Sequence, residues 1–238
     1  MKNVLITGGS RGIGKAMVEL FSSRGYNVAF TYRSSEEKAR SLAEKTGALA
    51  IKADSEISDE IAAAVALTEE KLGRVDILIN NAAYSSFSLI QDLSEAEWNK
   101  TFAVSVTAAF LYSKAVIGGM ISQKWGRIIN IGSMWGSVGA SCEVHYSAAK
   151  AALVGFTKAL AKELGPSGIT VNAVAPGLIR TDMNAHLGDD VIKEIGEETP
   201  LSRIGEPSEV AEAVFFLAGE GASFITGEIM NVSGGFVV

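Results

Sequence analysis

The sequence predicts an α/β fold in which a doubly wound, seven-stranded parallel sheet is covered by helices on both faces. Short, β-rich apolar runs recur along the chain, and longer segments with apolar residues at helical spacing separate them. The runs contain few polar residues, as expected for parallel strands that are buried on both faces. The predicted strands are residues 4–6, 28–30, 49–51, 75–79, 128–131, 170–174 and 229–232. We expect the strand order 3-2-1-4-5-6-7.

The segments between the strands predict amphipathic helices, for example at residues 14–24, 36–45 and 57–72, where charged residues occupy the face opposite the apolar one. The chain has 238 residues and no internal repeat or linker, so we expect residues 1–238 to form one domain. The longest interval without a clear strand lies between Pro176 and Pro207. An interval of this length is typical of a functional cover, so we expect a substrate lid at about residues 177–206.

The composition argues against several classes of protein. Lys and Arg total 21 and Asp and Glu total 27, giving a formal net charge of −6 without a basic tract, so a nucleic-acid partner is not expected. The longest apolar stretch, residues 107–121, is interrupted by Lys114 and is short for a membrane span. One cysteine and two histidines give no basis for a metal site. Because the first residues also lack a signal-peptide pattern, we expect a cytoplasmic protein.

A glycine-rich turn follows the first predicted strand and precedes a predicted helix. Gly8, Gly12 and Gly14 have the spacing G-x-x-x-G-x-G, which differs from the standard G-x-G-x-x-G. Such a turn lets backbone N–H groups at a helix N-terminus approach a pyrophosphate. The alternative is an ordinary tight turn in a protein with 25 glycines. The residues expected to contact a dinucleotide here are Gly8, Ser10, Arg11, Gly12, Ile13 and Gly14.

The end of the second predicted strand favours NADP over NAD. An NAD-binding protein places an acid there to accept from the ribose 2′-hydroxyl, whereas this strand ends in Arg33 and has no carboxylate before Glu36. Arg33 and Arg11 together suit a 2′-phosphate. The alternative is that Arg33 is a solvated strand-end charge. Asp54, after the third strand, is a candidate acceptor for the adenine amino group or, equally, a helix N-cap.

Tyr146 and Lys150 are four residues apart, so on a helix they share one face. The attraction between an ammonium and an ionised phenol about 4 Å away is on the order of 4 kcal/mol at an effective dielectric of about 20, which corresponds to about three pKa units. We therefore expect Lys150 to lower the pKa of Tyr146 toward the range of a general acid–base. The pair follows Ser133, itself just after a predicted strand, which makes a chance occurrence of the pattern improbable.

From residue 2 to residue 238 the chain resembles a short-chain dehydrogenase/reductase with a Rossmann-type fold. The motifs that carry the resemblance are the glycine turn, Asn80-Asn81-Ala82-Ala83, Ser133, Tyr146-x-x-x-Lys150 and Pro176-Gly177. Residues 126–129, 168–172 and 224–228 are most similar to those of bacterial 3-oxoacyl-[acyl-carrier-protein] reductases. The resemblance implies an NADPH-dependent carbonyl reductase that assembles as a homotetramer.

The resemblance also implies roles for individual residues. Tyr146 would donate a proton to the carbonyl oxygen, Ser133 would hydrogen-bond to that oxygen, and Lys150 would also hold the nicotinamide ribose. The remaining cofactor contacts would come from Asn81, Ala82, Pro176, Gly177, Ile179 and Thr181. The helices at residues 98–120 and 144–164 and the C-terminal strand, ending at 234–238, would form the subunit interfaces.

Two positions depart from the family pattern. Ala83 replaces a glycine, which adds one methyl group beside the cofactor. Ser105 replaces an asparagine that supports a helix kink and a water in the proton relay. Because serine can hydrogen-bond to a carbonyl one turn back and bend a helix, we expect the relay to survive with a weaker anchor and lower activity. Ser105 is thus a candidate catalytic residue and also the one feature that favours the alternative of a non-catalytic NADP-binding regulatory protein.

The predicted pocket wall is mostly apolar and suits a ketone or an acyl thioester. Its candidate residues are 85–90, Met134, Trp135, 142–145 and 178–187. Of the basic pair that docks acyl carrier protein in the resembling reductases, Lys124 is present, but Ser167 occupies the second position. Residues 133–136 and 139–144 look more like those of reductases that act on the 5-aminopentanone modification of elongation factor P, and Glu143 would suit an aminated substrate. The sequence leaves the choice of ketone open.

Overall fold

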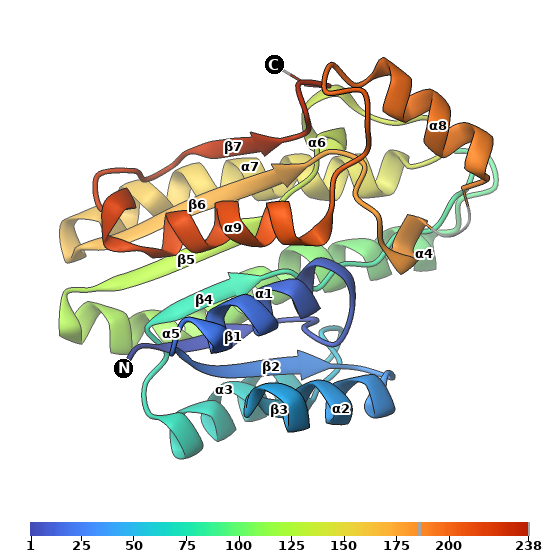
Figure 1. The fold of residues 1–238 in the computed structure, drawn as a ribbon. Coiled ribbons are helices and arrows are strands. Elements are labelled where there is room, and N and C mark those ends of the chain that lie inside the picture. Colours follow the sequence, from blue (N-terminus) through green and yellow to red (C-terminus); the bar gives the residue numbers. More distant parts are fainter. Residues whose placement is uncertain (185–186, 238) are drawn as a thin grey trace.

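The computed structural model describes residues 1–184 and 187–237. They form one α/β domain around a seven-stranded sheet with the order β3-β2-β1-β4-β5-β6-β7, in which every neighbouring pair is parallel (Figure 1). The predicted fold class and strand order are confirmed. The strands are β1 (Asn3–Ile6), β2 (Asn27–Tyr32), β3 (Leu49–Lys52), β4 (Ile77–Asn80), β5 (Gly126–Ile131), β6 (Ile169–Pro176) and β7 (Ile229–Val232).

Helices cover both faces of this sheet and connect its strands. The longer ones are α1 (Gly12–Ser23), α2 (Glu36–Thr46), α3 (Ser58–Leu72), α4 (Glu95–Phe102), α5 (Ala108–Gln123), α7 (Val144–Leu164), α8 (Asp189–Glu198) and α9 (Pro207–Ala218). The short ones are η1 (Ala103–Thr107), α6 (Trp135–Val138), η2 (Gly165–Ser167), η3 (Asp182–Asn184) and η4 (Glu220–Ala222). The strand order reverses between β1 and β4, and ligands of open α/β sheets bind at the carboxyl ends of the strands beside such a reversal.

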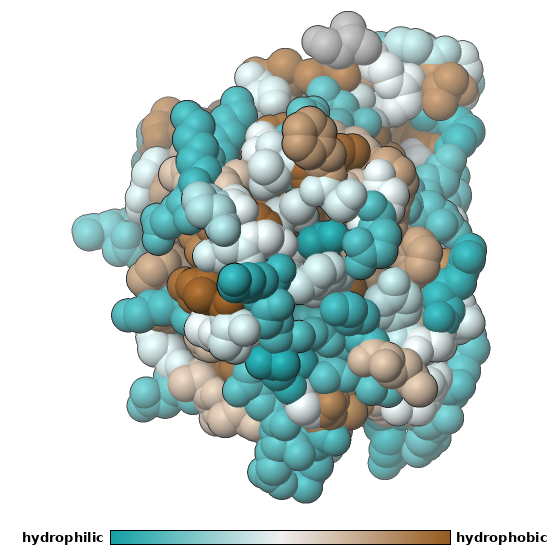
Figure 2. Space-filling model, turned by 90° about the vertical axis from the view of Figure 1, so that its left-hand side faces the viewer, coloured by the Kyte–Doolittle hydropathy of each residue, from teal (hydrophilic) through white to brown (hydrophobic). Residues whose placement is uncertain are grey.

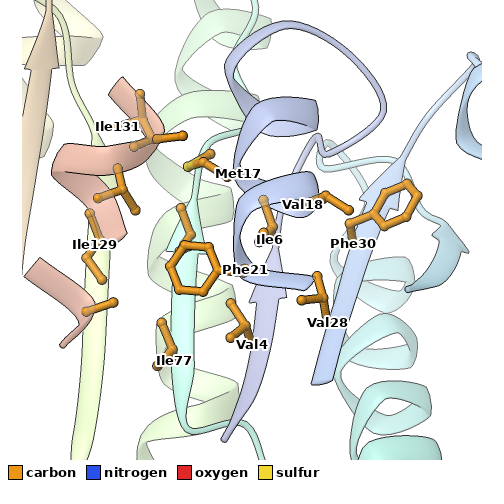
Figure 3. Close-up of a cluster of buried hydrophobic side chains, with 14 of the residues drawn as sticks. Val4, Ile6, Met17, Val18, Phe21, Val28, Phe30, Ile77, Ile129 and Ile131 are labelled. Carbon is orange, nitrogen blue, oxygen red and sulfur yellow. The ribbon is translucent and has the colours of Figure 1, made fainter. Parts of the chain in front are cut away.

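The core is divided by the sheet because successive side chains of a strand point to opposite faces. Val4 and Ile6 of β1 pack with Phe21 of α1 in the cluster drawn in Figure 3, to which α2 and α9 also contribute. Leu5 of the same strand faces α3, α5 and α7 in the second cluster. Every residue of β4, β5 and β6 is buried. This two-sided burial explains the continuous apolar runs of the sequence.

A buried chain of polar side chains links the middle of the sheet to α7. The Asn80 amide at the end of β4 donates to Asn130 Oδ1 of β5 at 2.9 Å, and the Asn130 amide donates to Thr157 Oγ1 of α7, also at 2.9 Å. Asn130 and Thr157 are completely buried. Because buried polar groups that lose their partners are costly, this chain fixes α7 against β5.

The helices α4, η1 and α5 run on without a break from Glu95 to Gln123, a 29-residue span long and apolar enough, by length and composition alone, to cross a membrane. This helix is longer than the apolar stretch at residues 107–121 suggested, because residues 95–106 continue it. Ala108, Tyr112 and Val116 of this helix are buried in the core against the sheet. Interior helices of globular proteins meet the same criteria, so the span is weak evidence for a membrane.

The segment expected to be a lid contains helix α8 and the short η3, and it lies beyond the carboxyl ends of the strands (Figure 1). Its two ends are joined: Arg180 N donates to Gly205 O, and Gly205 N donates to Leu178 O, each at 2.9 Å. Residues 185–186, which also belong to the predicted lid and pocket wall, lie outside the described residues, as does residue 238 at the C-terminus.

Candidate active site

The glycine turn between β1 and α1 is shaped to admit a ligand close to the backbone. Gly8 and Gly12 have φ of 66° and 53°, a conformation that favours glycine, and a Cβ on Gly14 would collide with the Gly8 carbonyl oxygen. Arg11, the N-cap of α1, makes no side-chain capping bond. The first N–H groups of α1 therefore point to a groove where an anion such as a pyrophosphate can bind.

Most of the predicted cofactor residues line this groove. It is bounded by Gly8, Ser10, Arg11, Gly12, Ile13, Gly14, 31–35, 53–55, 81–84, Val104 and 181–183. A second cleft contains Ser133, Tyr146, Lys150, Pro176, Gly177 and Ile179. Ile13, Asn81 and Thr181 border both clefts, so the two are continuous. This shape fits an extended dinucleotide whose reactive end reaches Tyr146.

Asn81 also has a structural task that its motif does not indicate. Its side-chain amide donates to the carbonyl oxygens of Thr7, at 2.8 Å, and of Gly8, at 3.1 Å. The Thr7 hydroxyl in turn accepts from the backbone N–H groups of Asn81 and Ala82, each at 2.9 Å. These bonds attach the glycine turn to the end of β4, so Asn81 fixes the shape of the groove that it lines.

At the other end of the groove, the structure adds a carboxylate that sequence reasoning missed. Arg33 Nη1 lies 3.2 Å from Glu56 Oε1, and the same carboxylate oxygen is 3.6 Å from Lys100 Nζ. The Asp54 carboxylate accepts from the Glu56 N–H at 3.0 Å. Glu56 follows β3, and β3 pairs with β2, the strand that leads to Arg33. The adjacency of these two strands in the predicted order was the signal that could have revealed Glu56.

Ser133, Tyr146 and Lys150 meet in the second cleft. Lys150, 2% exposed, donates from Nζ to the Ile131 carbonyl at 2.7 Å, and Nζ lies 5.4 Å from the centre of the Tyr146 ring. Burial lowers the pKa of Lys150 to about 8. Burial raises the pKa of Tyr146, the Glu143 charge adds to this, and a hydrogen bond with Ser133 opposes it.

The expected net lowering of the Tyr146 pKa is not found, because burial and the Glu143 charge raise it. Burial is the largest cause of the raised pKa of the phenol, and the Lys150 ammonium is engaged by the Ile131 carbonyl. The phenol is therefore protonated at neutral pH, as a group must be before it can donate a proton. The chemistry available to the pair is proton donation by Tyr146, with the Lys150 charge favouring the phenolate that remains.

The pocket wall is attached to the start of α7 by hydrogen bonds from three of its serines. Ser85 Oγ donates to Glu143 Oε1 at 2.8 Å, Ser86 N donates to His145 Nε2 at 3.3 Å, and Ser88 N donates to the Cys142 carbonyl at 2.9 Å. His145 is completely buried, so it holds the wall and is not part of the pocket surface. The residues that do face the pocket include Ser85, Ser86, Phe87, Trp135, Glu143, Leu178, Met183 and Asn184.

Comparisons with known proteins agree with this geometry. A family model described as enoyl-(acyl carrier protein) reductase matches residues 8–237. The 3-oxoacyl-[acyl-carrier-protein] reductase FabG of Vibrio cholerae is 42% identical over 238 residues, which cover 98% of this chain and 96% of that protein. The uncharacterized oxidoreductase YmfI of Bacillus subtilis is 41% identical, covering 99% and 98%.

A solved structure also matches this chain over its full length. A doubly mutated short-chain dehydrogenase/reductase of Serratia marcescens matches with a TM-score of 0.92 at 36% identity, covering 100% of this chain and 98% of that one. The chain belongs to the short-chain dehydrogenase/reductase family. It is therefore an oxidoreductase acting on CH–OH and C=O groups, which disfavours the alternative of a non-catalytic regulatory protein.

Within this family member, Ser105 does not act as the sequence suggested. Residues Ala103–Thr107 form a π-helical turn, which widens the helix at the expected place. Ser105 is 2% exposed, and its hydroxyl has no hydrogen-bond partner among the described residues. The expected bond from the serine to a backbone carbonyl is therefore absent from the described structure. Ser105 lines neither cleft, whereas its neighbour Val104 borders the cofactor groove.

Lys124, the residue expected to dock a carrier protein, lies far from the candidate active site of its own chain. Lys124 follows α5 and precedes β5, so it sits at the edge where the strands begin, whereas Ser133 follows the other end of β5. Ser167 lies beside β6 at the same distant edge. Figure 2 shows this end of the molecule, on which hydrophilic and hydrophobic residues are mixed. On its own chain, Lys124 therefore lies at the opposite edge of the sheet from Ser133.

Proposed function

We propose that this enzyme reduces a ketone with NADPH and that its substrate is a 3-oxoacyl thioester, the class named in its relatives. The observation that carries the proposal is the continuity of the groove at the glycine turn with the cleft that contains Ser133, Tyr146 and Lys150. A cofactor lying along both clefts would present its reactive end beside the only phenol that borders the second cleft in the described structure. The substrate ketone would enter from the side of Glu143.

Different parts of the groove would hold different parts of the cofactor. The helix N-terminus at Gly12 would hold the pyrophosphate, Arg11 and Arg33 the 2′-phosphate, and Asp54 the adenine amino group. The residues toward the nicotinamide would be Asn81, Ala82, Tyr146, Lys150, Pro176, Gly177, Ile179 and Thr181. The bound cofactor supplies the hydride, and the protein supplies orientation and charge.

The proton transfer falls to Tyr146. Its phenol would donate a proton to the oxygen of the ketone being reduced, so a hydroxyl would form and a phenolate would remain on Tyr146. The Lys150 ammonium stabilises that phenolate. The Ser133 hydroxyl donates to the substrate oxygen as charge develops on it. Residues 177–206 would cover the pocket, since Leu178, Met183 and Asn184 already form part of its wall.

We also propose that the enzyme is a cytoplasmic homotetramer. Phe110 and Ile121 of α5 are exposed, as are Phe216 of α9 and the fully exposed Phe224. Large apolar side chains gathered on a helix face are typical of subunit interfaces. One interface would use α5 and α7 and the other α9 and β7. A carrier protein docked at Lys124 would then have to serve the pocket of another subunit.

The test is NADPH oxidation, followed by the loss of its absorbance, with an acetoacetyl thioester, small neutral ketones and elongation factor P bearing the 5-aminopentanone group as substrates. We expect turnover of the thioester, and Tyr146→Phe is the control for adventitious oxidation. If the wild-type enzyme turns over none of these substrates, the proposal is contradicted.

One observation favours a second candidate, the ketone of the 5-aminopentanone group. Glu143 lines the pocket, is partly buried, and its carboxylate accepts from Ser85 without forming an ion pair among the described residues. A partly buried carboxylate suits an ammonium on the substrate, whereas an acyl chain gains nothing from it. Glu143→Gln should lower kcat/KM about tenfold for an amino ketone and leave that for an acyl thioester unchanged. Equal effects on both would remove this candidate.

A further inference from the structure

An ion-pair cluster of three residues lies at the adenosine end of the groove. The Glu56 carboxylate is 3.2 Å from the Arg33 guanidinium and 3.6 Å from the Lys100 ammonium. Arg33 comes from the end of β2, Glu56 from the loop after β3, and Lys100 from α4. Arg33 borders the cofactor groove, whereas Glu56 and Lys100 do not line it. The cluster therefore links a residue of the cofactor site to two residues outside it.

Glu56 and Lys100 are each held in place independently of Arg33. The Glu56 N–H donates to the Asp54 carboxylate, which fixes the loop after β3. The Lys100 ammonium lies 4.5 Å from the centre of the Tyr84 ring, a cation–π geometry, and Tyr84 borders the groove. The side chains of Lys100 and Glu56 are each 31% exposed, whereas that of Arg33 is 49% exposed. Arg33 is thus the member of the cluster that is most free to move.

We propose that Glu56 determines how strongly the enzyme prefers NADPH over NADH, by competing with the 2′-phosphate for Arg33. When the phosphate binds, the Arg33 guanidinium turns from the Glu56 carboxylate to the phosphate. Lys100 then balances the charge of Glu56, so that the carboxylate is not left unpaired beside the phosphate. The inference rests on the proposed use of NADPH and adds a specificity-determining residue that does not line the groove.

Two anions compete for Arg33 when NADPH binds. The 2′-phosphate and the Glu56 carboxylate seek the same guanidinium, and each also repels the other, so the carboxylate weakens NADPH binding on both counts. NADH has a neutral hydroxyl in place of the phosphate and should not respond to Glu56. Because the Arg33–Glu56 ion pair is partly exposed and screened by salt, the effect of Glu56 on NADPH affinity is moderate.

The experiment measures the Kd values of NADPH and NADH by calorimetric titration, without substrate. Glu56→Gln should tighten NADPH binding about threefold and leave NADH binding unchanged. Lys100→Gln should weaken NADPH binding about threefold, because Glu56 then keeps its full charge and its hold on Arg33. In the Glu56→Gln background, Lys100→Gln should have no effect on either Kd. The threefold gain from Glu56→Gln should shrink as salt is raised.

A matched control removes the same charge elsewhere. Glu44 pairs with Arg40 on the exposed face of α2, and Glu44→Gln should leave both Kd values unchanged. Thermal unfolding of each variant checks that the fold is retained. Unchanged NADPH affinity in Glu56→Gln would overturn the inference. An equal effect of Lys100→Gln on NADPH affinity in the wild-type enzyme and in the Glu56→Gln variant would also overturn it, because Lys100 would then act on the phosphate directly.

The two proposals can fail separately. If wild-type enzyme binds NADPH no more tightly than NADH, the proposed cofactor preference is wrong. If it prefers NADPH and Glu56→Gln behaves as wild type, only the role of Glu56 is wrong.

Discussion

Lys150 donates a hydrogen bond to the backbone carbonyl of Ile131, the last residue of β5, at 2.7 Å. Two residues further along the chain is Ser133, so the bond joins the helix that carries Tyr146 to the strand end that carries Ser133. A buried ammonium needs such an acceptor. The bond therefore places the charge of Lys150 within the candidate catalytic cluster and limits its rotamers.

The first prediction concerns Tyr146→Phe. Removal of the hydroxyl takes away the proposed proton donor and leaves the ring, so kcat should fall by about 10² or more. NADPH affinity should stay within a few-fold of wild type, because the cofactor groove is unchanged. Steady-state kinetics and a binding titration measure the two quantities. A loss of less than tenfold in kcat would mean that another group donates the proton.

The second prediction is a loss of reductase activity above about pH 8. Burial lowers the pKa of Lys150 to about 8, so its ammonium is present below this pH and lost above it. Without that charge, the phenolate formed at Tyr146 is less stable, and kcat/KM should decline as the pH rises through this value. Lys150→Arg keeps its charge across the range, so its profile, at lower activity, should lack the decline. An identical decline in both enzymes would assign it to another group.

The third prediction concerns cofactor preference. Arg33 and Arg11 border the groove, so NADPH should bind at least about tenfold more tightly than NADH, or about 1.4 kcal/mol. Arg33→Asp should invert this preference, because a carboxylate accepts from the ribose 2′-hydroxyl and repels a phosphate. Binding titrations of both cofactors to both proteins measure this. Retention of the NADPH preference in Arg33→Asp would show that Arg11 suffices.

The fourth prediction compares two buried serines of the same long helix. The Ser105 hydroxyl has no partner among the described residues, whereas the Ser113 hydroxyl accepts from the Asn80 amide at 3.4 Å. Ser105→Ala should therefore raise the free energy of unfolding by up to about 1 kcal/mol, whereas Ser113→Ala should lower it by about 1 kcal/mol. Thermal unfolding at one protein concentration ranks the three proteins. Strong destabilisation by Ser105→Ala would reveal a partner for that hydroxyl.

The fifth prediction concerns assembly. Light scattering at micromolar concentration should give the mass of four chains of 25.0 kDa each. Phe224→Ser should reduce this to two chains, because the fully exposed ring would lie in one of the two proposed interfaces. Leu201→Ser, which removes another exposed apolar side chain from the predicted lid segment, should leave the tetramer intact. A monomeric wild-type protein would contradict the proposal.

The fold was predictable because its strands are short, apolar and separated by amphipathic helices. Residues such as Val4, Leu5 and Ile6 are buried on alternate faces, so the run carries no polar position and indicates a parallel sheet. The glycine turn was predictable because its glycines follow a predicted strand and precede a predicted helix, where Gly8 and Gly12 have positive φ and Gly14 lies against the Gly8 carbonyl oxygen. Such features depend on neighbours along the chain.

What the sequence did not reveal depends on contacts between distant segments. The Glu56 carboxylate meets Arg33 only because β3 lies beside β2, and Lys100 joins them from a helix much further along. The pKa of Tyr146 follows from burial that no spacing rule supplies. The distant position of Lys124 likewise follows from which end of β5 it precedes, a matter of strand direction that a motif alignment does not record.

The buried chain from Asn80 through Asn130 to Thr157 has a consequence for how such an enzyme can change over evolution. Thr157 lies on the same helix as Tyr146 and Lys150, so the chain sets the rotational position of all three relative to the sheet. The substrate wall, by contrast, comes from separate loops that contribute Phe87, Leu178 and Met183. Loops can therefore be exchanged to accept a new ketone while the reducing chemistry is inherited unchanged.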